Sequence, residues 1–292
     1  MLHHFILTRF NIQLFRHDKH GHSIDSKSWL EERIKLFETY TLPSVIGQSC
    51  QDFTWILLVD SKTPAIYRER LMSYRKRCPQ ITYVSCEGEY GWRFANIFQQ
   101  VVEKQLKETD VKDGDFCLTT YFDNDDCFHK DYIKDIHDIL LQKNNNVLSK
   151  DGFVAFDYGL QYFTELGIAT RVKYANNHFI TLFERVSSVE NPSVRTCYGY
   201  GSHIDVEKRK VASVHHISQA SKPMWIEVIH KDNVDNDVMM TLNTCFINDK
   251  QLLRIDFSLD IDLQTGKKMK FFMRYLKQML RRLHNRLIPR KW

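Results

Sequence analysis

Three aspartates, Asp123, Asp125 and Asp126, follow an apolar run and are the residues of this chain best suited to chemistry; we call them the acidic cluster. The run, residues 116–122, reads FCLTTYF, which is typical of a buried strand. No basic residue lies among the three acids, and like charges this close repel one another unless a cation sits between them. Carboxylate oxygens are preferred ligands of divalent metals. The acidic cluster therefore predicts a divalent metal site at the end of a strand.

Other interpretations of the acidic cluster can be weighed by spacing. Asp125 or Asp126 could simply cap the helix that follows, since aspartate is favoured at helix N-termini. A calcium-binding EF-hand loop is excluded, because its sixth position requires glycine and is Phe128 here. The glycine-rich patterns GxxxxGK[ST] and GxGxxG do not occur. What remains is the Asp-x-Asp pattern of glycosyl transfer, in which a metal offsets charge on a departing nucleoside diphosphate.

Composition places the chain among ordinary globular proteins, since 43% of its 292 residues are hydrophobic and 26% are charged. Its seven cysteines are scattered and include no CxxC pair, which argues against a disulfide framework or a zinc ribbon and favours a reducing compartment. No secretory signal opens the chain, and the longest apolar run, residues 53–59, is too short to span a bilayer. We expect a cytoplasmic protein, at most peripheral at the inner face of the membrane.

The elements that must position the acidic cluster alternate along the first 140 residues. Apolar runs predict strands over residues 4–9, 53–59, 81–86 and 116–122. Helical spacing predicts helices over residues 29–46, 64–77, 92–107 and 132–142. Such alternation is typical of a mostly parallel sheet with crossover helices. Further strand-like segments follow without clear alternation, over residues 152–158, 168–174, 178–186 and 224–229.

Polar residues follow several of the predicted strands at their carboxyl ends. These residues are Thr8 and Arg9, Asp60, the segment 87–93, and the acidic cluster. In open α/β sheets ligands bind at the carboxyl ends of the strands. We therefore expect these side chains to gather at one edge of the sheet.

Four segments resemble the putative rhamnosyltransferase family of bacterial polysaccharide loci. They are HFILTRFNI (4–12), TLPSVIGQSCQDFTWILLVD (41–60), TTYFDNDDCFHKDYI (119–133) and PMWIEVIHKDNV (223–234). The resemblance implies a GT-A glycosyltransferase, which is an α/β fold with a mostly parallel central sheet. One departure is visible: the family pattern leads us to expect an arginine two residues before the first aspartate of the acidic cluster, where this chain has Tyr121.

The resemblance implies donor-binding roles for residues of the predicted edge. Asp60 would contact the nucleobase or the ribose, although an aspartate here could also simply end a strand in a turn. Thr8 and Arg9 match the edge of the first strand, where Arg9 would meet the base or a phosphate. Arg93 and Asn96 open the third helix on the donor side.

The resemblance also implies a separate role for each aspartate of the acidic cluster. Asp123 would bind the ribose or the sugar, and Asp125 and Asp126 would ligate Mg²⁺ or Mn²⁺. A third metal ligand in this fold often comes from far downstream and is usually a histidine. His230 follows a predicted strand and fits this role; the rival candidates are His215 and His216.

An inverting glycosyltransferase also needs a carboxylate that takes the proton of the acceptor hydroxyl. The segment 198–205 reads YGYGSHID, a glycine-rich loop followed by an acid, and it resembles the region that carries this base. We predict Asp205 as the base, although it could simply cap a helix. The alternative bases are Glu184 and Glu165.

The last segment, residues 267–292, differs from the rest in charge. It holds ten Lys and Arg and no acid, whereas residues 1–266 hold 31 basic and 36 acidic residues. Its apolar residues recur at helical spacing, at Met269, Phe272, Leu276, Met279, Leu280, Leu283 and Leu287. This pattern predicts a basic amphipathic helix on an anionic membrane surface, or else a helix packed on the body. No nucleic-acid-binding motif accompanies it, so we expect no nucleic-acid partner.

These features together predict three parts: a nucleotide-sugar-binding half (1–145), an acceptor-side half of the same domain (146–266) and the basic helix (267–292). The expected function is metal-dependent, inverting transfer of a sugar, with rhamnose as the first candidate. The donor would be a nucleoside diphosphate sugar, and the acceptor a bacterial surface glycan or a lipid-linked glycan. The alternative is a nucleotide- or carbohydrate-binding module without turnover. A nucleotidyltransferase is disfavoured, because residues 8–14 lack its glycine-rich loop.

Overall fold

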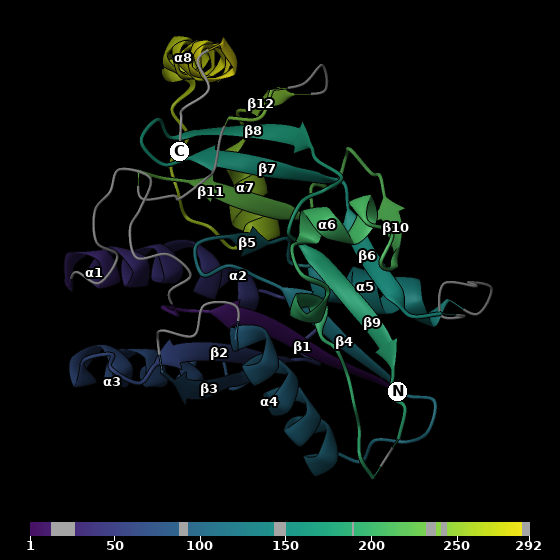
Figure 1. The fold of residues 1–292 in the computed structure, drawn as a ribbon. Coiled ribbons are helices and arrows are strands. Elements are labelled where there is room, and N and C mark those ends of the chain that lie inside the picture. The colour runs from purple at the N-terminus through teal and green to yellow at the C-terminus, as the bar shows by residue number, and fades with distance from the viewer. Residues whose placement is uncertain are drawn as a thin grey trace.

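A central sheet with helices on both faces organises the protein, in a computed structural model that describes residues 1–12, 27–87, 93–142, 150–188, 190–231, 238–240 and 244–287 (Figure 1). The seven described strands run in the order β10-β6-β9-β4-β1-β2-β3. Their bounds are β1 (Leu2–Arg9), β2 (Thr54–Asp60), β3 (Ile81–Cys86), β4 (Phe116–Tyr121), β6 (Gly152–Phe156), β9 (Ile180–Arg185) and β10 (Ser213–Ile217). All neighbours are parallel except β9, which is antiparallel to both β4 and β6. The predicted α/β fold with a mostly parallel sheet is confirmed.

The sheet is buried on both faces, which explains why its strands read as continuous apolar runs. On β1, Ile6 packs toward one face, while Phe5 and Leu7 pack toward the other. The first face is covered by α1 (Lys27–Leu36), α2 (Leu42–Ile46), α3 (Ala65–Ser73) and α5 (Tyr132–Leu141). The second is covered by α4 (Phe94–Glu108), the short 3-10 helix Cys197–Tyr200 and α6 (His203–Lys208).

The helix predicted over residues 29–46 is interrupted. A π-helical turn, Phe37–Thr41, separates α1 from α2. Pro43 explains the interruption, because it has no N–H to donate to the carbonyl of Thr39 four residues earlier.

A second sheet lies at the carboxyl edge of the first, as Figure 1 shows for β7, β8 and β11. Its strand order is β12-β8-β7-β11-β5. The bounds are β5 (Cys127–Phe128), β7 (Tyr158–Phe163), β8 (Ile168–Lys173), β11 (Trp225–Ile229) and β12 (Cys245–Ile247). Because β4 belongs to the first sheet and β5 to the second, the acidic cluster is the chain segment that joins them.

Aromatic rings fill the junction of the two sheets. Phe122 and Phe128 stack with centroids 3.8 Å apart, and Phe128 stacks on Tyr132 at 4.1 Å. Phe179, just before β9, stacks on Trp225 of β11 at 4.9 Å. Such pairs add about 0.5–1.5 kcal/mol each beyond the burial of their area. They fix how the second sheet sits over the edge that carries the acidic cluster.

Two further helices belong to the second sheet. The helix α7 (Lys250–Phe257) packs Leu253 and Phe257 against β7 and β11. The terminal helix α8 (Lys268–Leu287) packs Phe271 against Phe163 of β7. Among the described residues, none of the helices combines the length and the apolar composition needed to cross a membrane.

The two predicted halves of the chain share the first sheet, because β6, β9 and β10 come from the second half. The predicted boundary between residues 145 and 146 lies outside the described residues. The predicted strand over residues 152–158 is two strands, β6 and β7, which enter different sheets.

Gly159 provides a test of the junction. A Cβ atom at this position would lie 2.0 Å from the ring of Trp225, which is buried and hydrogen bonded through Nε1 to the Phe156 carbonyl at 2.8 Å. We expect Gly159→Ala to lower the free energy of unfolding by about 1–3 kcal/mol, because the ring has no space to move into. Urea denaturation measures this loss. Gly266→Ala is the matched control, since nothing lies within 4 Å of its Cβ, and equal stability of the two variants would contradict the packing described.

Candidate functional site

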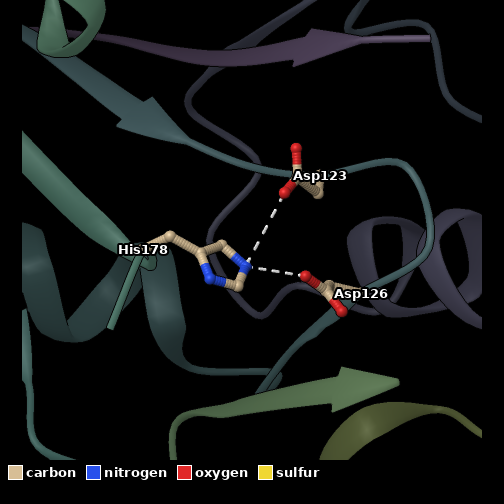
Figure 2. A group of neighbouring side chains, drawn as sticks. All are labelled: Asp123, Asp126 and His178. Carbon is tan, nitrogen blue, oxygen red and sulfur yellow. Dashed lines mark hydrogen bonds and ion pairs between the residues drawn. The ribbon is translucent and has the colours of Figure 1, made fainter. Parts of the chain in front are cut away.

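Asp126 lies at the centre of the site, immediately before β5. Its Oδ1 accepts the backbone N–H of Val228 on β11 at 2.9 Å, and its Oδ2 lies 2.7 Å from Nε2 of His178 (Figure 2). The same His178 nitrogen lies 3.9 Å from Oδ2 of Asp123. The carboxylate is thus held between the two sheets with one oxygen on each side.

His178 reaches the acidic cluster because of the antiparallel strand β9. Thr181 on β9 pairs with Thr120 on β4, so the residues just before β9 return alongside the residues just after β4. By this register His178 stands opposite Asp123. The histidine was missed in the sequence because its place depends on β9 entering the sheet between β4 and β6.

Asp123, Asp126 and His178 form a group that fits a divalent cation. One ligand atom from each lies within 4.8 Å of the others. Two carboxylate oxygens and one imidazole nitrogen are donors that suit Mn²⁺ well, and the carboxylates also suit Mg²⁺. We call Asp123, Asp126 and His178 the metal-ligand group.

Asp125 takes part in a different set of contacts. Its Oδ2 accepts a hydrogen bond from Arg33 on α1 at 2.7 Å and lies 2.9 Å from Nε2 of His230. Arg33 also donates to Oδ1 of Asn124 at 3.0 Å, and Asn124 donates in turn to the Phe10 carbonyl. Asp125 therefore ties α1 and the chain after β11 to the acidic cluster.

The predicted metal ligands are brought together only in part. Asp126 belongs to the metal-ligand group, and His230 does lie against the acidic cluster. The group takes His178 and Asp123, however, in place of His230 and Asp125. Metal ligation by Asp125 and His230 stays a prediction. Asp125 pairs with both Arg33 and His230, and these contacts give Asp125 and His230 a structural role.

The charges of the site are balanced by protein cations. Burial alone would raise the pKa of Asp125, but Arg33 and His230 hold it well below its usual range. Burial, together with the charges of Asp125 and Asp123, raises the pKa of Asp126 to about 6 against the opposing effect of His178. Burial alone would lower the pKa of His178, but Asp126 and Asp123 raise it to about 9. The repulsion expected within the acidic cluster is thus offset by Arg33 and His178.

Glu227 on β11 is a further buried carboxylate, close enough to His178 and Asp126 for their charges to act on it. It accepts a hydrogen bond from Gln161 Nε2 at 2.6 Å. Burial and the charges of Asp126 and Asp125 raise its pKa to about 7, against the opposing effect of His178. In the sequence, Glu227 is an acid inside an apolar run. Such a residue predicts a buried polar contact but does not identify its partner.

The predicted donor-binding residues lie at the ends of β1 and β2, in the segment after β4 and at the start of α4. Arg9 extends from the end of β1, and its guanidinium lies 3.5 Å from Oδ1 of Asp123. Arg9 also donates a hydrogen bond to the hydroxyl of Tyr121 at 3.2 Å. Tyr121 is the residue that stands where the family pattern led us to expect an arginine. Arg93 and Asn96 are exposed at the start of α4, and their contact with a donor stays a prediction.

Two other predicted donor contacts are used inside the protein. Thr8 is fully buried, and its hydroxyl accepts a hydrogen bond from Trp55 Nε1 at 2.9 Å. We therefore assign Thr8 to the core of the sheet and no longer to donor binding. Asp60 ends β2, and its Oδ1 accepts a hydrogen bond from the N–H of Lys62 at 2.8 Å. This contact is typical of an aspartate that ends a strand in a turn, the other role that the sequence allowed for Asp60. Its partly exposed side chain leaves the donor contact as a prediction.

The predicted base, Asp205, lies in the first turn of α6. Its carboxylate pairs with Arg209 at 3.2 Å. The residue of α6 that reaches the metal-ligand group is His203, whose ring lies 5.8 Å from that of His178 and 6.3 Å from that of Tyr121. Burial and the charge of His178 lower the pKa of His203 to about 3. The start of α6 thus borders the site, and the role of Asp205 stays a prediction.

The rival residues have partners elsewhere among the described residues. Glu184 accepts the backbone N–H groups of Arg195 and Thr196. Glu165 pairs with Arg274 of α8 at 3.3 Å. His216 lies 2.7 Å from Asp157, and the ring of His215 contacts Phe183.

Comparisons with known proteins identify related sequences and folds. The family model described as putative rhamnosyl transferase matches residues 6–242. No curated protein sequence matches the chain.

Among solved structures, S. aureus TarS 1-349 is 10% identical with a TM-score of 0.42, over 77% of this chain and 60% of that one. The same protein in complex with UDP is 11% identical with a TM-score of 0.41, over 78% and 61%. Its complex with UDP-GlcNAc is 10% identical with a TM-score of 0.41, over 80% and 60%. The chain spans about three fifths of these TarS chains.

The ion pairs of Asp125 give a prediction for stability. Asp125→Ala leaves Arg33 without its buried carboxylate, so we expect the free energy of unfolding to fall by about 3 kcal/mol at neutral pH. Asp138→Ala removes an exposed pair with Lys134 and should cost about 0.5 kcal/mol or less. Because the pKa of Asp125 is depressed by folding, the difference between wild type and Asp125→Ala should shrink as the pH falls below about 4. Denaturant unfolding at several pH values measures this difference in the free energy of unfolding. A difference that does not change with pH would contradict the ion pairs of Asp125.

Proposed function

Because the chain belongs to the family of putative rhamnosyl transferases, which are glycosyltransferases, we propose that it transfers a sugar from a nucleoside diphosphate to a bacterial surface glycan. Rhamnose is the first candidate for the sugar. The observation that carries the proposal is the metal-ligand group at the carboxyl edge of a mostly parallel sheet, where α/β proteins bind nucleotides.

Asp123, Asp126 and His178 would hold the metal, with Mn²⁺ or Mg²⁺ as candidates. A bound ion of this kind supplies Lewis acidity toward the diphosphate. The protein contributes the fixed geometry: Asp126 accepts a hydrogen bond from the Val228 N–H, and His178, two residues before β9, packs against Phe179. The donor would lie along the edge between β1 and α4, near Arg9, Arg93 and Asn96.

The acceptor would approach from the side of α6. We keep Asp205 as the proposed base of an inverting reaction, because α6 begins beside His178. A carboxylate that is not itself a metal ligand would take the acceptor proton without competing for the ion.

The terminal helix supports a membrane-bound acceptor. Among its described side chains, Phe271 and Gln278 are buried, whereas seven apolar side chains are between 37% and 72% exposed. These seven, which we call the apolar face, are Met269, Phe272, Met273, Leu276, Met279, Leu280 and Leu283. Between residues 268 and 283 the same helix carries six cations and no acid: Lys268, Lys270, Arg274, Lys277, Arg281 and Arg282.

An anionic lipid surface is the partner that fits this combination. A second copy of the chain would bring two strongly basic helices together, and their like charges would oppose pairing. Lipid headgroups would instead pair with the cations while the apolar face enters the acyl boundary. A lipid-linked glycan at the inner face of the membrane would then lie within reach of the site.

The donor proposal predicts metal-dependent stabilisation. We expect one class of nucleoside diphosphate sugar, together with Mn²⁺, to raise the melting temperature by roughly 4 °C at 100-fold excess over Kd. Asp126→Asn should abolish this shift, because the carboxylate faces both His178 and the expected ion. Asp256→Asn on α7 is the control. It removes a carboxylate that pairs with Lys130, and it should leave the shift of the melting temperature unchanged.

Turnover separates an enzyme from a binding module. Release of nucleoside diphosphate from the stabilising sugar donor, lost in Asp126→Asn, supports the transferase. If a donor stabilises the protein but no nucleoside diphosphate is released with any acceptor, the protein is a binding module. If no donor gives metal-dependent stabilisation, the proposed function is contradicted.

The membrane proposal predicts binding to vesicles. The full chain should sediment with vesicles of phosphatidylglycerol and not with neutral phosphatidylcholine, because the helix needs anionic headgroups. Replacing Leu276, Leu280 and Leu283 by serine should reduce binding at least about tenfold, since each exposed leucine loses about 1.5 kcal/mol or more of burial. Replacing the exposed Ile66 and Met72 of α3 by serine is the control. Equal sedimentation of both variants would argue against α8 as the contact.

A further inference from the structure

Thr196 has a backbone conformation that an amino acid with a side chain rarely adopts. Its φ is 63° and its ψ is 162°, a region occupied almost entirely by glycine, and its side chain is branched at Cβ. The residue is fully buried, and its Oγ1 has no hydrogen-bond partner among the described residues. Such a conformation persists only where the surrounding structure enforces it.

Two neighbouring strands hold the backbone at Thr196. The carboxylate of Glu184 on β9 accepts the N–H of Arg195 and that of Thr196, both at 3.0 Å. The hydroxyl of Thr119 on β4, which pairs with β9, accepts the next N–H, that of Cys197, at 2.8 Å. We call these contacts of Glu184 and Thr119 the backbone clamp. The clamp thus binds three successive N–H groups around the strained residue.

The carboxylate of Glu184 is fully used by this contact. It is only 5% exposed, and both of its oxygens accept N–H groups of residues 195–196. Burial raises the pKa of Glu184, and the hydrogen bonds from the two N–H groups act against this rise. A carboxylate in this setting is not placed to take the proton of an acceptor hydroxyl, which was the alternative role that the sequence allowed for Glu184.

The residues that follow the backbone clamp build one wall of the site. Directly after the clamp comes the 3-10 helix, in which the ring of Tyr198 stacks on Phe98 of α4 at 5.1 Å and contacts Tyr121 at 4.5 Å. Tyr121 in turn lies beside the ring of His178, with centroids 5.7 Å apart. Packed rings therefore connect the clamp to the metal-ligand group.

The start of α6 also depends on the backbone clamp. Only residues 197–202 separate Thr196 from His203, the first residue of α6. The ring of His203 lies 5.8 Å from that of His178. Over so short a connection, a different backbone conformation at Thr196 would move this ring relative to the metal-ligand group. A misplacement of about 1 Å in an active site can cost about a hundredfold in rate.

We propose that Glu184 is a positioning residue: by holding Thr196 in a conformation suited to glycine, it sets Tyr198 and α6 against the metal-ligand group. This inference rests on the proposed function and deepens it, because α6 lies on the side from which the acceptor would approach and carries the proposed base, Asp205. Glu184 acts through the backbone and does not itself touch the substrate.

The position of His203 tests the backbone clamp without any substrate. In protein labelled with ¹³C-histidine, the ring signals of His203 in the NMR spectrum are identified by their absence from His203→Gln. We expect Glu184→Gln to shift these signals, because an amide keeps only one acceptor oxygen and turns an NH₂ group toward the backbone N–H groups. Adding Thr196→Gly to Glu184→Gln should return the signals to their wild-type positions, since glycine adopts this conformation without the clamp.

Glu38→Gln is the matched control. Glu38 also accepts several hydrogen bonds, from Arg70 and Tyr74, but on the first face of the sheet, away from α6. Its replacement should lower the melting temperature without shifting the His203 signals. If Glu184→Gln fails to fold in thermal melts, the double variant with Thr196→Gly decides: a folded protein with wild-type His203 signals supports the proposal, and an unfolded or shifted one overturns it.

The strain at Thr196 has its own test in thermal melts. Thr196→Gly alone should melt at or above the temperature of the wild type. The change removes the unfavourable conformation, together with a buried hydroxyl that has no partner among the described residues. A clearly lower melting temperature would mean that Thr196 is not strained, and the need for the backbone clamp would be overturned.

Release of nucleoside diphosphate connects this positioning to catalysis. With Mn²⁺ and a panel of UDP-, GDP- and dTDP-sugars, we expect Glu184→Gln to lower kcat at least about tenfold. The KM of the donor should stay nearly unchanged, because the donor side at β1 and the start of α4 is not altered. Adding Thr196→Gly should recover most of kcat, which would not happen if Glu184 were the base.

The outcomes separate the inference from the function on which it rests. Wild-type protein that releases no nucleoside diphosphate from any sugar of the panel contradicts the proposed function, while the His203 signals still decide the role of the backbone clamp. Unchanged His203 signals or unchanged turnover in folded Glu184→Gln overturn the positioning role. Loss of turnover that Thr196→Gly does not restore also overturns it, because Glu184 would then take part in the chemistry itself.

Discussion

The mutual repulsion of three aspartates at the junction of two sheets is the constraint on which the rest of the site depends. Asp123, Asp125 and Asp126 join β4 to β5 and lie within a few residues of one another. Each neighbouring element supplies something that holds one of them. The helix α1 brings Arg33 to Asp125, the residues before β9 bring His178 to Asp126, and β11 adds a backbone N–H. The cost of gathering these charges explains why so many elements converge at this edge.

The contacts divide the acidic cluster into a fixed part and an adaptable part. Asp125 is bound at short distances by Arg33 and His230, so it serves the architecture. Asp123 is partly exposed, and among the described residues its paired cations, Arg9 and His178, lie at 3.5 and 3.9 Å, so its carboxylate can turn toward an ion. Asp126 belongs to both parts, since one oxygen is anchored to β11 and the other faces His178. This division gives a physical reason why the acidic cluster has three acids: two belong to the metal-ligand group, and the third, Asp125, holds the neighbouring elements in place.

Local patterns predicted the parallel sheet, the acidic cluster at its edge and the closeness of His230, because these depend on alternation and on strand ends. His178 and Arg33 were missed, since their positions depend on an antiparallel insertion and on how α1 docks. Thr8 was misplaced for a related reason: a hydroxyl near a strand end can point into the sheet, and here it meets Trp55. For α8 the amphipathic pattern allowed either burial or exposure of the apolar residues, and only their packing decides between the two.

The central claim is that His178, together with Asp123 and Asp126, holds the metal. The most direct measurement is pulsed electron paramagnetic resonance of the Mn²⁺-loaded protein labelled with ¹⁵N-histidine. The account predicts the hyperfine coupling of one directly bound imidazole nitrogen, retained in His230→Gln and lost in His178→Gln. A coupling that survives in His178→Gln and disappears in His230→Gln would contradict it.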